Sequence, residues 1–273
     1  MRRVPAWQRL VSEGIFSSRA DAERWILSGR VRAGGKPVTS AGQPVGADEQ
    51  FTVRGFEQAY IAKGGYKLEG ALAAFPLCVE GRVCIDAGAS TGGFTDCLVK
   101  HGASKVYAID VGFGQLAGSL RLHPSVVNLE RTNIGEEALL SLDPLPSLGT
   151  VDLSYLSLRK AVPQFARILH GQGDLLCLVK PLFEIDSAEA RRTGSVPSDA
   201  YEPLLASLSD DLQRGGYPVC GVTHSPVTGN NGTLEFFLWI SLGAADSLPP
   251  DRRKLAIRQA VSAARALPAY HKA

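Results

Sequence analysis

The sequence predicts an α/β fold in which a mostly parallel sheet carries helices on both faces, ends in an antiparallel hairpin and is preceded by a small α+β domain. Two observations predict the sheet. From residue 83 onward, short apolar runs typical of buried strands alternate with helix-like segments, and the first run leads into a glycine-rich turn. A third observation, an excess of positive charge in the first 67 residues, sets the small domain apart.

Length and composition exclude several classes of protein. The chain has 273 residues, and 45% of them are hydrophobic, which is enough for one large domain and a small one. No apolar run approaches the ~20 residues of a membrane span, and the N-terminal residues lack the apolar core of a secretory signal. The five cysteines form no Cys-x-x-Cys pair. We therefore expect a cytoplasmic protein with no disulfide framework and no metal site.

Charge is distributed unevenly along the chain. Residues 1–67 contain 11 lysines and arginines against 6 aspartates and glutamates, whereas the remainder contains 18 against 21. A basic module joined to a mildly acidic one favours binding of a polyanion, although a solvated basic surface without a partner is the alternative.

The first forty residues predict two short helices followed by small strands. Ser17 or Ser18 is a natural N-cap for a helix that ends before Gly29, and Val31 and Val38 flank a hairpin turn. Several basic side chains lie on or beside this helix and hairpin, where they could face one phosphate backbone. They are Arg19, Arg24, Arg30, Arg32 and Lys36.

Residues 18–38 resemble the S4-like RNA-binding domain. Two positions depart from that pattern: Trp7 stands where the first helix usually has Asp, and Gly34 replaces the usual Asn or Asp of the turn. The alternative is a small helix-hairpin unit that only packs on its neighbour.

The second domain is predicted to open with a helix that begins near residue 62 and carries Lys67 close to its start. The helix macrodipole disfavours a cation there, so Lys67 is either functional or a solvated lysine.

The glycine-rich turn has the features of a ligand cradle. Gly88, Gly92 and Gly93 let a ligand approach the backbone, and Ser90, Thr91 or Thr95 could cap the helix that follows. A tight connection without a ligand is the alternative. The next strand, residues 105–110, ends in Asp110, at a spacing close to that of a ribose-binding acid.

The later strands decide between two kinds of doubly wound sheet. Residues 126–129, 150–153 and 174–179 read as the third, fourth and fifth strands, with helix-like segments at 115–120 and 157–169. Residues 217–223 and 234–242 then follow one another with no helix between, so they should be antiparallel. A dinucleotide-binding dehydrogenase would continue strand, helix, strand. The antiparallel hairpin is typical of S-adenosylmethionine-dependent methyltransferases, whose sheet is Rossmann-like.

Four charged residues are predicted at the ligand edge of this sheet: Lys67, Asp152, Lys180 and Glu235. Buried charges are costly unless they are paired, and paired networks cluster at active sites. A purely structural set of salt bridges is the alternative.

The order Lys, Asp, Lys, Glu is similar to the catalytic set of the FtsJ-like ribose 2′-O-methyltransferases, and the whole chain resembles the TlyA (hemolysin A) family. The resemblance rests on residues 63–68 (KGGYKL), 86–95 (DAGASTGGFT), 110–116 (DVGFGQL), 129–133 (LERTN), 152–158 (DLSYLSL), 178–184 (LVKPLFE) and 232–238 (GTLEFFL). Leu182, Thr233 and residues 186–199 depart from the pattern.

The resemblance implies transfer of a methyl group from S-adenosylmethionine to the ribose 2′-hydroxyl of cytidine in ribosomal RNA, with ribosomal RNA or ribosomal subunits as partners. It implies an S4-like domain at 1–58, a methyltransferase domain at 59–243 and a tail helix at 244–273. Lys67, Asp152, Lys180 and Glu235 would be catalytic, and Lys180 would contact the 2′-hydroxyl as a neutral base or as a cation.

The resemblance also implies residues for the two ligands. The cofactor residues would be Asp86, Gly88, Ala89, Ser90, Thr91, Gly92, Gly93, Phe94, Asp110, Val111, Asn133 and Asp152. Lys63 would join Arg19, Arg24, Arg30, Arg32 and Lys36 in binding RNA.

Two further alternatives concern the chain as a whole. Its methyltransferase fold could be catalytically inert and serve RNA binding alone. A membrane-lytic protein has little support, because only the tail at residues 252–267, with Leu255, Ile257 and Val261 among arginines, is amphipathic. That tail could bind a membrane surface or RNA, or pack back on its domain.

Overall fold

The computed structural model describes residues 3–13, 15–16, 19–46, 48–55, 59–229, 232–244 and 247–267. The predicted N-caps Ser17 and Ser18 lie outside these residues. Contacts divide the chain into two compact units between Lys63 and Gly64, and each unit is described by itself.

The N-terminal unit is a small α+β domain with its own core. Its elements are β1 (Val4–Pro5), α1 (Ala6–Ser12), α2 (Arg19–Leu27), β2 (Val31–Ala33), β3 (Lys36–Pro37), β4 (Pro44–Val45) and β5 (Phe51–Val53). The strands form a three-stranded sheet in the order β3-β2-β5 and the pair β1-β4. Trp7, Leu10, Ile26, Val31 and Val45 are buried together between helices and strands. The two predicted helices and the hairpin are therefore confirmed.

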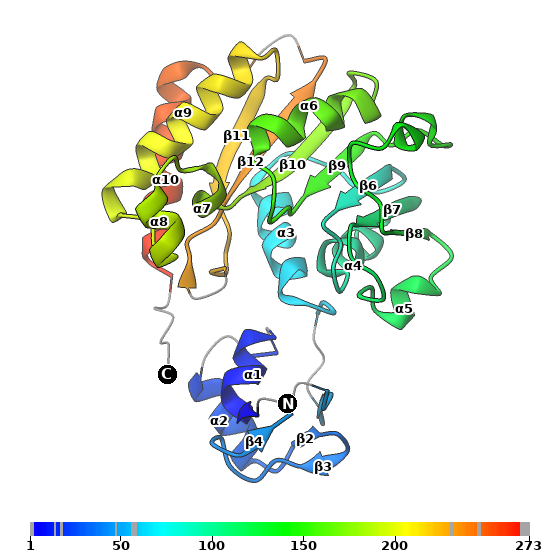
Figure 1. The fold of residues 1–273 in the computed structure, drawn as a ribbon, viewed down its shortest axis with the longest axis vertical. Coiled ribbons are helices and arrows are strands. Elements are labelled where there is room, and N and C mark those ends of the chain that lie inside the picture. The colour runs from blue at the N-terminus through cyan, green and yellow to red at the C-terminus, as the bar shows by residue number, and fades with distance from the viewer. Residues whose placement is uncertain are drawn as a thin grey trace. The chain divides into compact units, whose positions relative to one another are not determined.

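The second unit is built on a seven-stranded sheet in the order β11-β12-β10-β9-β6-β7-β8 (Figure 1). Its strands are β6 (Val83–Ala87), β7 (Lys105–Asp110), β8 (Val126–Glu130), β9 (Leu148–Val151), β10 (Gly173–Val179), β11 (Val219–His224) and β12 (Phe236–Leu242). Strands β6 to β10 are parallel, whereas β12 is antiparallel to both β10 and β11. The mostly parallel sheet with a terminal antiparallel hairpin is confirmed.

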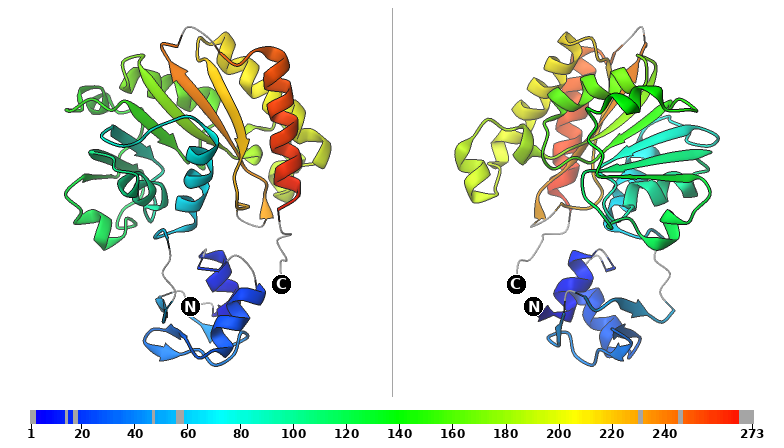
Figure 2. Two further views of the ribbon diagram at one scale, coloured as in Figure 1. Left: turned by 180° about the vertical axis from the view of Figure 1, so that it is seen from behind. Right: turned by 45° about the vertical axis from the view of Figure 1, so that its right-hand side comes forward.

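Helices cover both faces of this sheet. They are α3 (Lys63–Ala74), α4 (Gly93–Lys100), α5 (Gly118–Arg121), α6 (Leu158–Ile168), α7 (Pro181–Glu184), α8 (Ala188–Thr193), α9 (Tyr201–Arg214) and α10 (Pro250–Arg265), with 3₁₀ turns η1 (Glu137–Ser141) and η2 (Ser198–Ala200). Neighbouring residues of β12 show the two faces: Phe236 packs against Tyr201 of α9, and Phe237 stacks on Phe94 of α4. Figures 1 and 2 show α3 and α9 on opposite faces.

The C-terminal helix α10 packs back on the sheet, against β11 and α9 (Figure 2). Ile257 and Val261 are buried in the main core, in agreement with the alternative in which the tail packs back on its domain. Leu255 was expected on the same apolar face but is 55% exposed, because it lies about 200° around the helix from Ile257 at 100° per residue. Within the described parts of the chain, no helix combines the length and the apolar character needed to cross a membrane.

Three local predictions were wrong. The fourth strand is Leu148–Val151 rather than residues 150–153, because its ladders to β6 and β10 begin at Leu148. The helix expected at 115–120 is the shorter α5. The N-cap of α4 is Gly92 in a left-handed conformation with φ of 100°, and no side chain caps the helix. The hydroxyls of Ser90 and Thr95 instead bond to Gln115 and Asp86.

Candidate active site

The glycines of the turn after β6 are required by close packing. A Cβ on Gly88 would lie 2.3 Å from the backbone oxygen of Asp152, and a Cβ on Gly93 would lie 2.9 Å from Cα of Gly64. The turn is thus pressed between the end of β9 and the start of α3. This packing accounts for two of the glycines without a ligand, so the case for a ligand depends on the space beside the turn.

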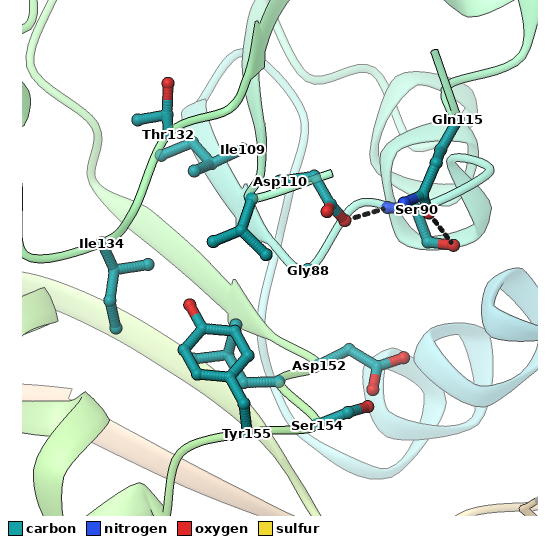
Figure 3. A pocket seen from close by; sticks show the side chains of 12 residues that line it. Gly88, Ser90, Ile109, Asp110, Gln115, Thr132, Ile134, Asp152, Ser154 and Tyr155 are labelled. Carbon is teal, nitrogen blue, oxygen red and sulfur yellow. Dashed lines mark hydrogen bonds between the residues drawn. The ribbon is translucent and has the colours of Figure 1, made fainter. Parts of the chain in front are cut away.

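A cavity of about 220 Å³ opens beside the turn, at the carboxyl ends of the parallel strands (Figure 3). Ligands of doubly wound sheets bind at this edge. Five residues that were predicted to bind the cofactor line it, namely Gly88, Ser90, Asp110, Val111 and Asp152. The rest of the lining was not predicted: Ile109, Gln115, Thr132, Ile134, Leu153, Ser154 and Tyr155.

Backbone donors hold the Asp110 carboxylate in place at this cavity. Oδ2 accepts a hydrogen bond of 2.8 Å from the amide of Ser90, and Oδ1 accepts one of 2.7 Å from the amide of Gly112. Ser90 has a positive φ of 48°, which is uncommon for a residue other than glycine. The carboxylate is therefore fixed in orientation, and its remaining lone pairs can accept from a ligand's hydroxyls.

Tyr155 stands across the cavity from Asp110 (Figure 3). Partial burial raises the pKa of its hydroxyl, and the negative charge of Asp110 raises it further. Tyr155 and Ile134 follow predicted site residues by only a few positions, so the sequence did contain a signal for them: they lie in loops that leave the same sheet edge.

Asp86 lies beneath the turn and is not among the lining residues. Its carboxylate accepts hydrogen bonds from the hydroxyls of Thr95, at 2.6 Å, and Thr150, at 2.8 Å. Burial raises the pKa of this carboxyl to about 6, although the two hydroxyls act in the opposite direction. Asp86 thus ties β6 to α4 and β9.

The other predicted cofactor residues, Ala89, Thr91, Gly92, Gly93, Phe94 and Asn133, do not line the cavity either. Phe94 is buried against Phe237, and Asn133 is exposed, with its side-chain oxygen accepting from the amide of Gly135. Their contact with a cofactor remains a prediction.

The four predicted catalytic residues form two ion pairs. Lys180 Nζ lies 2.5 Å from Asp152 Oδ1 and donates a hydrogen bond of 2.7 Å to Ser154 Oγ. Lys67 Nζ lies 2.5 Å from Glu235 Oε2, and these two side chains are only 10% and 6% exposed. Asp152 Oδ1 and Glu235 Oε2 each lie within ion-pair distance of a lysine, but neither oxygen accepts a hydrogen bond of good geometry.

Strand order explains why these residues meet at one edge. Asp152 follows β9, Lys180 follows β10 and Glu235 precedes β12, and these three strands are neighbours in the sheet. Because β12 runs antiparallel, its first residue lies beside the last residue of β10. Lys67 is supplied by α3, whose start packs on Gly93. The site therefore combines one buried ion pair, Lys67–Glu235, and one partly exposed ion pair, Lys180–Asp152, with a cavity that holds a fixed carboxylate.

Comparison with known proteins agrees with this arrangement. Residues 60–242 match the FtsJ-like methyltransferase family, and residues 8–51 match the S4 domain. The chain belongs to the FtsJ-like methyltransferase family.

Relatives of this FtsJ-like methyltransferase place it in the TlyA group. It is 38% identical over 264 residues to the 16S/23S rRNA (cytidine-2′-O)-methyltransferase TlyA of Mycobacterium tuberculosis, covering 96% of this chain and 98% of that protein. It is 36% identical over 230 residues to Hemolysin A of Brachyspira hyodysenteriae, covering 82% and 94%. A solved structure named as a hemolysin, from Streptococcus thermophilus, has a TM-score of 0.78 at 32% identity and covers 97% of this chain and 98% of its own.

The predicted RNA-binding residues of this FtsJ-like methyltransferase lie mainly on α2 and the β2-β3 hairpin. Arg19 forms an ion pair of 2.7 Å with Glu23 and stacks on Trp7. Arg24 forms an ion pair with Asp21. Three further positions were predicted: Arg30 stacks on Trp25, Arg32 donates to the carbonyl of Gly35, and Lys36 is exposed. Lys63, the sixth, begins α3.

One group of possible metal ligands comes together within the described residues: Glu69, Cys97 and His101. His101 Nε2 lies 2.6 Å from Glu69 Oε2, so two of the three already bond to each other. Sequence spacing did not reveal this group, because Glu69 belongs to α3, whereas Cys97 lies in α4 and His101 is the C-cap of α4. The expectation that this FtsJ-like methyltransferase needs no metal stays a prediction.

Proposed function

We propose that the protein transfers a methyl group from S-adenosylmethionine to the ribose 2′-hydroxyl of cytidine in ribosomal RNA. The observation that carries the proposal is the Lys180–Asp152 pair, because Asp152 also lines the cavity that holds Asp110. A group that can act on a hydroxyl thus adjoins a space that can hold the methyl donor. The name of the Mycobacterium tuberculosis relative supports cytidine and ribosomal RNA as the substrate.

The cavity fits S-adenosylmethionine. Asp110 would accept hydrogen bonds from its ribose hydroxyls, and Ile109, Ile134 and Tyr155 offer apolar surface for adenine. The close approach of Gly88 to Asp152 leaves no room for a Cβ at the floor of the site. No lysine or arginine lines the cavity within the described residues, and this suits a cationic sulfonium better than the pyrophosphate of a dinucleotide. When bound, the cofactor supplies an activated methyl group.

The residues of the chain would orient the 2′-oxygen and help to remove its proton. Lys180 Nζ is held by Asp152 and Ser154, so one N–H or a lone pair remains for the 2′-oxygen. As a neutral amine Lys180 takes the hydroxyl proton; as a cation it orients an oxygen lone pair and the proton leaves to water. Alignment of the attacking oxygen with the methyl carbon supplies much of the rate in either case. The buried Lys67–Glu235 pair supports the edge on which Lys180 stands.

The N-terminal domain would hold the RNA. The match to the S4 domain and the exposed basic residues of α2 and the hairpin support this role. We propose an S4-like domain at 1–58, a methyltransferase domain at 59–243 and a tail at 244–273. We also place the protein in the cytoplasm, where its proposed substrate, ribosomal RNA, resides.

Nucleoside analysis tests the proposal. Ribosomal RNA incubated with the protein and S-adenosylmethionine should yield 2′-O-methylcytidine. Lys180→Ala should lower the single-turnover rate by about 100-fold or more, the usual scale for losing a general base or a positioned charge. Binding of RNA and cofactor, measured in parallel, should stay at the parental level.

Two outcomes would contradict the proposal. A methyl group on a base would exclude ribose chemistry. Tight RNA binding by the parental protein with no transfer would favour the catalytically inert fold.

A further inference from the structure

Glu184 connects the two segments of chain that carry Lys180 and Asp152. It is the last residue of α7, four positions after Lys180, and its side chain is only 2% exposed. Its Oε2 accepts hydrogen bonds from Ser157 Oγ, at 2.6 Å, and from Arg159 Nη1, at 3.1 Å. Its Oε1 accepts a third, of 2.7 Å, from the amide of Leu158.

The three donors all belong to the start of α6, which follows the loop that leaves β9 with Asp152 and Ser154. Ser157 is the N-cap of that helix, and its hydroxyl oxygen accepts from the amide of Arg159 while the hydroxyl proton goes to Glu184. The carboxylate thus completes the cap and lies at the positive end of the helix dipole. One buried group thereby fixes the start of α6 to the end of α7.

We infer that Glu184 is a positioning residue for methyl transfer, which sets the place of Lys180 relative to Asp152 and Ser154. The inference rests on the proposed function and names a residue that acts through Lys180 rather than on the substrate. Lys180 Nζ must meet Asp152 and Ser154 from another strand, and its own backbone is the junction between β10 and the short helix α7 that ends at Glu184. A shift of about 1 Å in such a group can cost about a hundredfold in rate.

Asp211 provides a matched control. It lies on α9 and binds the same Arg159, with Arg159 Nε 2.6 Å from Asp211 Oδ2. Asp211 therefore shares the ion-pair network of Glu184 but makes no bond to Ser157 or Leu158 among the described contacts. Both variants lose a contact to Arg159, whereas the bonds to Ser157 and Leu158 are affected only in the Glu184 variant.

The test compares Glu184→Gln with Asp211→Asn. The glutamine keeps the shape of the side chain, but its NH₂ group is a donor where the carboxylate had an acceptor oxygen. This NH₂ group would face other donors, either Ser157 and Arg159 or the amide of Leu158. We expect kcat to fall by about 10- to 100-fold in Glu184→Gln, with KM for S-adenosylmethionine and RNA affinity within about twofold of parental. Asp211→Asn should keep kcat within about twofold.

A double-mutant cycle with Lys180→Ala distinguishes a positioning role of Glu184 from a merely structural one, because only a positioning role makes the two losses in kcat depend on each other. If Glu184 acts through Lys180, the double variant should be no slower than Lys180→Ala alone. Ser157→Ala, which removes one of the three bonds, should lower kcat by a smaller factor and keeps the test open if Glu184→Gln fails to fold.

Three results would overturn the inference: parental kcat in Glu184→Gln, equal losses in Glu184→Gln and Asp211→Asn, or losses that multiply in the double variant. Absence of any 2′-O-methyl product from the parental protein would instead contradict the proposed function, so the two failures are distinguishable.

Discussion

The N-terminal domain and the proposed catalytic edge, which carries Lys67, Asp152, Lys180 and Glu235, both depend on charged side chains, but they hold them in opposite ways. In α2 the ion pairs are local, at spacings of three or four residues, and the Arg19 and Arg24 side chains are 58% and 74% exposed. At the catalytic edge the partners come from distant parts of the sequence, and Lys67 and Glu235 are almost completely buried. Water and salt screen the first set, whereas the second is desolvated. Exposed charges can exchange their partners for a polyanion, and buried ones fix geometry.

The largest effect on stability is expected when the buried Lys67–Glu235 ion pair is broken. Lys67→Met leaves the Glu235 carboxylate desolvated without its cation, so we expect the free energy of unfolding to fall by about 3–5 kcal/mol. Glu23→Gln removes the partner of Arg19 on the surface and should cost only about 0.3–0.5 kcal/mol. Urea unfolding of the two variants measures the contrast. Similar costs in both would show that burial is not what separates the two regions.

The next largest effect is expected on cofactor affinity, when the carboxylate of Asp110 is removed from the cavity. Asp110→Ala should weaken S-adenosylmethionine binding by about 1.5–3 kcal/mol, the size of hydrogen bonds to a charged group. RNA affinity should be unchanged, because Asp110 lies in the second unit of the chain, whereas the S4-like domain is the first. Calorimetric titration measures the cofactor affinity. An affinity equal to that of the parent would remove Asp110 from the cofactor site.

Much of the sheet, and the meeting of charged residues at one of its edges, could be predicted from sequence for a physical reason. Apolar runs mark buried strands, and the carboxyl ends of parallel strands meet at one edge. Asp110, Asp152 and Lys180 each follow such a run, and this position alone predicts that they lie at the same edge. Glu235 joins them because a hairpin without a helix has to be antiparallel.

Pairing and capping could not be predicted, because they depend on tertiary packing. Nothing local to Lys67 identifies Glu235 as its partner, and nothing local to Glu184 shows that it bonds to the start of α6. The cap expected from Thr95 was wrong because its hydroxyl bonds to Asp86, buried beneath the turn. Each of these outcomes was decided by a residue on another element.

The smallest effect per residue is expected for the exposed basic residues of the N-terminal domain. Their contribution to RNA affinity should depend on salt concentration, and this dependence distinguishes it from the effects above. Neutralising Arg19, Arg30 and Lys36 together should weaken RNA binding and lower the slope of log affinity against log salt by about 0.7–0.9 for each lost phosphate contact. Arg252→Gln, Lys254→Gln and Arg258→Gln, combined on the exposed side of α10, remove the same charge and form the control. If the N-terminal domain anchors the RNA, the control should keep the parental slope, and both triple variants should bind S-adenosylmethionine normally. Equal loss of slope in the two triple variants would mean that RNA responds to the net charge of the protein, and the basic residues of α2 and its hairpin would then have no special part in binding.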